Sequence, residues 1–140
     1  MAWQTPKTDW AVRLDENGNY LGDYFEVSDY HRIKGNLQFL QRYGESLFSE
    51  IVLPKIPAVT VESFGYASTI NALERSLDAI RDATVNPGIP ETKTWSGNSA
   101  APLYSDLNRI EGATLLFYEI FQLTEKNLPK LAFEMGGSDF

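Results

Sequence analysis

The chain has 140 residues, of which 43% are hydrophobic and 13% aromatic, with a formal net charge of −7 and no cysteine. This length and apolar content predict a single folded domain over residues 1–140. The acidic balance argues against a nucleic-acid partner, the absence of cysteine excludes disulfides and thiolate chemistry, and no apolar stretch approaches the roughly 20 residues that cross a bilayer, so no membrane partner is expected.

The N-terminal segment looks extended and rich in turns. Asn17-Gly18 lies between two short apolar segments, a pattern typical of a tight two-strand turn. We therefore expect a β-hairpin near the N-terminus, inserted before the first helix.

A first helix is expected from Ser28 to about Phe48. Ser28 is a suitable N-cap, and Asp29 would lie where the helix dipole favours negative charge. The apolar residues recur at helical spacing on one face, with Gly44 in the remaining slot. That face consists of Ile33, Leu37, Leu40 and Leu47.

A middle helix is expected at about residues 63–83, ended by Asn86-Pro87-Gly88. The connection that follows, residues 84–104, is longer than a compact bundle requires, and long ordered loops are usually functional. The apolar stripe of the middle helix is Ile70, Leu73, Leu77 and Ile80.

A third helix is expected from Ser105 to about Lys126, followed by Pro129 and a C-terminal tail at 128–140 that would hold a short strand and a loose end. The fold class is thus mainly α, a small three-helix bundle with extended arms. The apolar face of the third helix is Leu107, Ile110, Phe117 and Phe121, widened by Ala113, Leu116 and Ile120.

One short segment occurs twice, as SDYHRIKG at 28–35 and as SDLNRIEG at 105–112. A Lys-Thr-Trp element precedes each copy, KTDW at 7–10 and KTW at 93–95. The repeat predicts two related half-units, one at about 6–50 and one at about 92–127, each an extended arm that leads into a capped helix. The two helices and their arms would be related by an approximate two-fold.

The repeated arginines allow two interpretations. In the first, Arg32 and Arg109 are solvated residues of an ordinary helix start. In the second, they clamp the arm or a neighbouring subunit, because arginine is favoured at bidentate and interfacial contacts. Arg32 is also placed for an i,i+3 ion pair with Asp29. The cost of Gly35 and Gly112 inside helices predicts close packing at both positions.

The sequence shows no catalytic signature, and we expect no enzyme activity, no cofactor and no metal site. His31 is the only histidine, and no partner is spaced for a general base or a metal ligand. Residues 15–26 partly follow a calcium loop, but Tyr20 stands where such a loop needs glycine. The loop positions that do match are Asp15, Asn17, Asn19, Asp23 and Glu26.

The tryptophans also allow two interpretations, as anchors of a core or interface or as the lining of a sugar-binding surface. Burial of the three indoles favours the first, and exposure together on one face favours the second. The residues expected at an interface are Trp3, Trp10, Trp95, Arg32, Arg109 and Phe140.

A tryptophan arm followed by Asp106-Leu107-Asn108-Arg109-Ile110-Glu111 resembles small structural proteins of tailed bacteriophages and prophages of Firmicutes-type bacteria. It is similar in particular to proteins of the tail, baseplate or fibre region. The resemblance implies a non-enzymatic structural, assembly or adaptor protein of a virion, assembled in the host cytoplasm, with self-copies and other virion subunits as partners. The alternative is a carbohydrate- or receptor-binding accessory module of the same particle.

Overall fold

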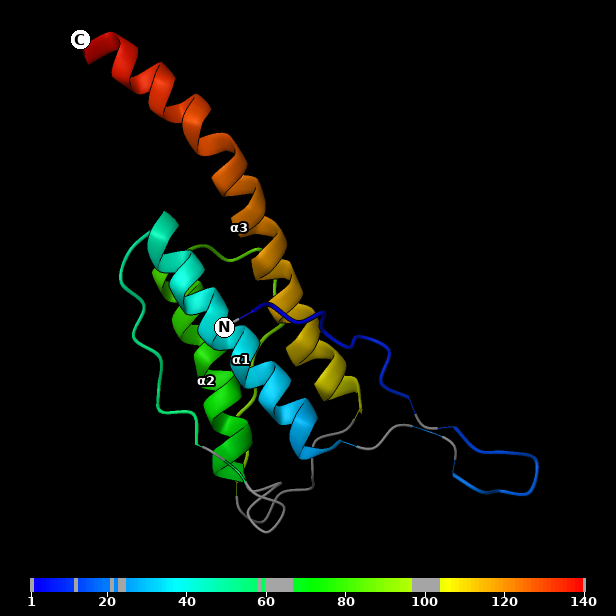
Figure 1. The fold of residues 1–140 in the computed structure, drawn as a ribbon. Helices are drawn as coiled ribbons and strands as arrows, with labels where there is room; N and C mark the ends of the chain where they lie inside the picture. The colour runs from blue at the N-terminus through cyan, green and yellow to red at the C-terminus, as the bar shows by residue number, and fades with distance from the viewer. Residues whose placement is uncertain are drawn as a thin grey trace.

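The computed structural model describes residues 2–11, 13–20, 22, 25–57, 59, 67–96 and 104–139, with side chains placed as far as residue 128. This part of the chain is mainly helical, as the sequence predicts. It forms three α-helices, α1 (Val27–Leu47), α2 (Ala67–Ala83) and α3 (Tyr104–Asp139), and no strand (Figure 1).

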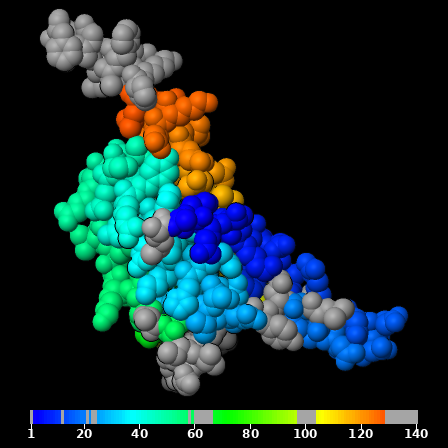
Figure 2. Space-filling view, in the orientation of Figure 1, coloured from blue at the N-terminus to red at the C-terminus, as the bar shows by residue number. Residues whose placement is uncertain are grey.

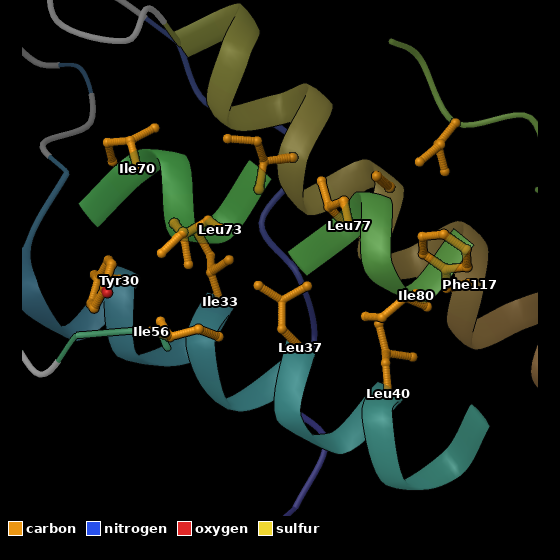
Figure 3. Close-up of a cluster of buried hydrophobic side chains, with 14 of the residues drawn as sticks. Tyr30, Ile33, Leu37, Leu40, Ile56, Ile70, Leu73, Leu77, Ile80 and Phe117 are labelled. Carbon is orange, nitrogen blue, oxygen red and sulfur yellow. The ribbon is translucent and has the colours of Figure 1, made fainter. Parts of the chain in front are cut away.

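The three helices run in the same direction. Arg32 near the start of α1 pairs with Glu111 near the start of α3, and Tyr43 further along α1 contacts Phe121 further along α3. In α1 and α2, labelled core residues follow one another in the same order (Figure 3). Parallel neighbours need connections that return along the bundle, whereas antiparallel helices need only short loops. This direction accounts for the length of the 84–104 connection.

The apolar stripes predicted from the sequence form the core. Nearly every stripe residue of the three helices is at most 2% exposed, and Leu47, Leu116 and Ile120 at the margins are partly buried. Gly44 lies where the core is tightly packed, because an added Cβ would lie 2.7 Å from Ile51 Cδ1 and 3.2 Å from Phe121 Cε2. Here the missing side chain lets α1, the following segment and α3 approach closely.

The helix starts differ slightly from the predicted ones. Helix α1 begins at Val27 with Glu26 as its N-cap, so the prediction of Ser28 as N-cap is wrong. Asp29 accepts a hydrogen bond from the Glu26 backbone N–H at 2.8 Å, and this carboxylate completes the helix start in place of the serine hydroxyl. Helix α3 begins at Tyr104, one residue before the predicted Ser105.

The segment around Asn17-Gly18 is a turn, and the predicted hairpin is not confirmed. Its described residues hold one isolated antiparallel bridge, between Leu14 and Tyr20. Asp15 accepts hydrogen bonds from the backbone N–H groups of Asn17 and Asn19, at 2.9 and 2.7 Å. The side-chain hydrogen bond from Asn19 also helps to lower the pKa of Asp15. These local bonds satisfy the turn without a strand ladder.

Helix α3 is longer than predicted. It continues as helix through position 129 to Asp139, so the predicted strand and helix end at about Lys126 are wrong. Good helix formers on both sides of Pro129 favour continuation, although proline removes one backbone donor. The end of α3 extends past the ends of α1 and α2 (Figure 1). Among the described residues, no helix is both long and apolar enough to cross a membrane.

Candidate functional site

A buried ion pair joins the starts of α1 and α3. Arg32 donates from Nε to Glu111 Oε1 at 2.8 Å and from Nη2 to Glu111 Oε2 at 2.7 Å. Its third nitrogen, Nη1, donates to Asp29 Oδ1 at 2.8 Å. The Glu111 carboxylate is fully buried, and the Arg32 side chain is 16% exposed. The guanidinium is therefore held on two edges by two carboxylates.

The N-terminal arm, residues 2–10, binds to the same carboxylate. Trp10 donates its indole N–H to Glu111 Oε2 at 2.8 Å, and the Lys7 backbone N–H donates to Glu111 Oε1 at 3.0 Å. Asn108, one turn before Glu111, accepts from the Trp10 backbone N–H at 2.8 Å and donates to the Trp10 carbonyl at 3.1 Å. We call Arg32, Asn108 and Glu111 the Glu111 clamp.

A second ion pair of the same kind joins α3 to α2. Arg109 donates from Nη1 to Glu74 Oε1 and from Nη2 to Glu74 Oε2, both at 2.7 Å. The Glu74 carboxylate is fully buried, and the Arg109 side chain is 12% exposed. Arg109 Nη2 also lies 3.6 Å from Asp106 Oδ1.

The second arm, residues 91–95, binds this carboxylate through equivalent atoms. Trp95 donates its indole N–H to Glu74 Oε2 at 2.8 Å, and the Lys93 backbone N–H donates to Glu74 Oε1 at 3.3 Å. Asn71 accepts from the Trp95 backbone N–H and donates to the Trp95 carbonyl, both at 2.7 Å. We call Asn71, Glu74 and Arg109 the Glu74 clamp.

Each clamp uses the full acceptor capacity of its carboxylate. Glu111 accepts from Arg32, Lys7 and Trp10 in four hydrogen bonds, two at each oxygen. An ionised carboxylate has about four lone-pair sites, so Glu111 is saturated, and Glu74 accepts four bonds in the same way. The glutamates raise the pKa of both Arg32 and Arg109. The two glutamates therefore join the arms to the helices, and their charges are neutralised by the arginines.

The three tryptophans lie on the two arms. Trp10 is 4% exposed, between the Glu111 clamp and the ring of Phe25. Trp3, on the same arm, stacks on Tyr118 of α3 with ring centroids 4.1 Å apart. Trp95 is partly buried at the Glu74 clamp. Figure 2 shows the arm on the surface beside α1.

The structure decides between several of the sequence interpretations. The solvated interpretation of the two arginines is wrong, because both side chains are largely buried in ion pairs. The predicted Arg32–Asp29 ion pair is confirmed. The prediction of close packing at Gly112 is wrong, since an added Cβ there would meet nothing within 4 Å. Phe140 lies outside the described residues.

The glutamates and asparagines that receive the arms have no role that the sequence patterns predict. The available signal was Asn-x-x-Glu, present as Asn71 and Glu74 and again as Asn108 and Glu111. This spacing places both side chains on one helix face, one turn apart. His31 takes the asparagine position in α1 and lines a shallow surface depression with Lys34.

Within the described part of the chain, no three His, Cys, Asp or Glu side chains are grouped to hold a metal ion. No protein-family model, curated protein or solved structure matches the chain.

Proposed function

We propose that the protein is a non-enzymatic structural, assembly or adaptor subunit of a phage virion, placed in the tail, baseplate or fibre-attachment region. Its partners are self-copies and other virion subunits, and it assembles in the host cytoplasm. The observation that carries the structural role is the saturation of Glu111 and Glu74, the two most enclosed carboxylates of the site.

This observation favours a structural role over catalysis for a physical reason. A general base or nucleophile needs a free lone pair within reach of a substrate. In both clamps, arginine, indole and backbone donors already take these lone pairs. The clamps fix the arms to the bundle and thereby fix the surface that the bundle presents to neighbours.

The virion assignment rests on the resemblance of the motif at 106–111. In this chain, each polar letter of the motif has a defined contact. Asp106 binds Lys93 at 2.7 Å, Asn108 and Glu111 bind the N-terminal arm, and Arg109 binds α2. Three of the four polar letters hold the arms and the fourth joins α3 to α2, and contacts of this kind suit a small assembly protein.

The two arm-and-helix segments are, in this proposal, related half-units. The matching bonds of the two arms support the relation. In each arm the tryptophan backbone N–H bonds to an asparagine, the indole N–H bonds to a glutamate, and the backbone N–H of the preceding lysine bonds to the same glutamate. Even the lysine ammonium groups lie similarly over the indoles, at 5.3 and 5.8 Å from the ring centroids.

The placement of the tryptophans favours this role over the carbohydrate-binding alternative. A sugar platform needs indole faces exposed together. Trp10 is almost fully buried, one face of Trp3 is stacked on Tyr118, and Trp95 lies on the other arm at the Glu74 clamp.

Mass spectrometry of purified particles from the source phage or prophage tests the proposal. We expect the chain in intact particles at a fixed ratio to known tail subunits. A chain lacking residues 1–9 should keep its helical circular dichroism and fail to incorporate. Absence of the full chain from particles, or tight binding of a free oligosaccharide by the monomer, would overturn the proposal.

A further inference from the structure

We infer that the N-terminal arm, residues 2–10, exchanges between copies of this chain, so that the arm of one copy binds to α1 and α3 of a second copy. The inference rests on the proposed assembly function and adds the surface through which copies join. It is carried by the contacts of the arm and by the length of the chain that follows it.

The arm is bound by side chains of α1 and α3. The Glu111 clamp forms hydrogen bonds with the backbone of Lys7 and with both the backbone and the indole of Trp10. At the far end of the arm, the Gln4 backbone N–H and carbonyl pair with the Asn36 side chain at 2.9 and 2.7 Å. All these bonds join the arm to the bodies of α1 and α3, so an arm from another copy can make every one of them.

The connection between the N-terminal arm and α1 is longer than an arm bound in this way requires. The second arm reaches its helix through residues 96–103, whereas the N-terminal arm reaches α1 through residues 11–26, which are twice as many. Sixteen residues can span about 50 Å when extended. The extra length includes the turn at 14–20, which projects from the bundle (Figure 1) and leaves Leu14 62% exposed.

Exchange costs little because the exchanged contacts are the same as those within one copy. The hydroxyls of Tyr20 and Tyr104 bond between the turn and the body, and breaking this part-buried bond lets the turn extend as part of the connection between copies. A ring or filament of copies would then be joined by many identical arm contacts.

Crosslinking of two single-cysteine variants tests the exchange, and the chain has no cysteine of its own. Gln4 and Gln38 line the same depression on α1, so Gln4→Cys and Gln38→Cys place thiols close to each other. Gln4 contacts Asn36 through its backbone alone, and Gln4→Cys retains those bonds. The two variants are mixed in urea, refolded together and treated with a short bis-maleimide.

We expect covalent dimers in the mixture, with each variant alone giving none through this pair. Random pairing predicts one variant of each kind in roughly half of the exchanged dimers. Gln4→Cys mixed with Asp82→Cys, an exposed position on α2, is the matched control for chance collisions. The double variant Gln4→Cys/Gln38→Cys on one chain shows that the reagent spans the two positions.

Dimer in the mixture no higher than in the Asp82 control, together with efficient crosslinking within the double variant, would overturn exchange. The virion proposal is judged separately by the presence of the chain in particles, so the two can fail independently. A synthetic peptide of residues 1–10 gives a second measurement. It should bind a chain lacking those residues, and the same peptide with Trp10→Ala should bind at least about tenfold more weakly. Equal binding of the two peptides would count against recognition in trans.

Discussion

The two clamps share their letters and differ in how their arginines are used. In the Glu111 clamp, Arg32 turns its Nε edge to the glutamate and leaves Nη1 for Asp29 at 2.8 Å. In the Glu74 clamp, Arg109 turns its Nη1 and Nη2 end to the glutamate. Its Nε is buried and, within the described structure, has no hydrogen-bond partner.

A single residue in the arms explains the difference. KTDW contains Asp9, which pairs with Lys7 at 3.0 Å, whereas KTW has no acid. Lys93 therefore pairs with Asp106 at 2.7 Å, and Arg109 is left 3.6 Å from the same carboxylate. The acid equivalent to Asp106 in the first copy is Asp29, which is free to bind Arg32 closely. An inserted aspartate thus redistributes the ion pairs of a whole cluster.

The largest expected effect comes from removing each glutamate charge in turn. Glu74→Gln leaves the Arg109 guanidinium with one distant carboxylate, and loss of one partner of a buried pair costs about 3–5 kcal/mol of unfolding free energy. Glu111→Gln should cost less, about 1.5–3 kcal/mol, because Arg32 keeps Asp29. Urea denaturation followed by circular dichroism measures both. A larger loss in Glu111→Gln would contradict the comparison.

The helices were predictable from the sequence, and the clamps were not. Stripes such as Leu73, Leu77 and Ile80 mark a buried face whatever the topology, because periodicity alone sets that face. The partner of Arg32 depends instead on which helix lies beside α1 and in which direction it runs. Glu111 resembles any exposed helix acid in sequence, and only parallel packing of α1 and α3 buries it against Arg32.

Helix starts and the C-terminal end show a different limit. Glu26 and Ser28 are both able to cap α1, and the choice follows from the position of Asp29, which is bound to Arg32 across the turn. At the other end of the chain, Pro129 predicts a stop, but the helical backbone continues. Local propensity is a weak guide where one residue opposes its neighbours.

A pair of glycine variants tests whether the glycine of the repeat serves the clamp. Gly112→Ala should raise the unfolding free energy by about 0.5–1 kcal/mol, because the position is helical and open. Gly44→Ala is the matched control and should lower it by about 1–3 kcal/mol through overpacking against Ile51, Thr84 and Phe121. Thermal or urea unfolding measures both. Destabilisation by Gly112→Ala would show that the second copy needs its glycine.

The smallest expected effect isolates the role of the arm lysine. Lys93→Met removes the competitor for Asp106, so Arg109 Nη2 should close from 3.6 Å to within hydrogen-bond range of Asp106 Oδ1 in a crystal structure of the variant. Because the Lys93 side chain is 54% exposed, the lost pair and the improved pair should nearly cancel, within about 0.5 kcal/mol.

A double-mutant cycle makes the exchange of partners visible. In the Lys93→Met background, Asp106 has lost its lysine partner. If Arg109 takes the place of Lys93, Asp106→Asn should still cost a few tenths of a kcal/mol of unfolding free energy in that background. The matched change in the first copy, Lys7→Met, should leave the Arg32–Asp29 distance at 2.8 Å, since Lys7 pairs with Asp9. If Arg109 stays at its distance when Lys93 is gone, backbone geometry and not competition sets the difference between the clamps.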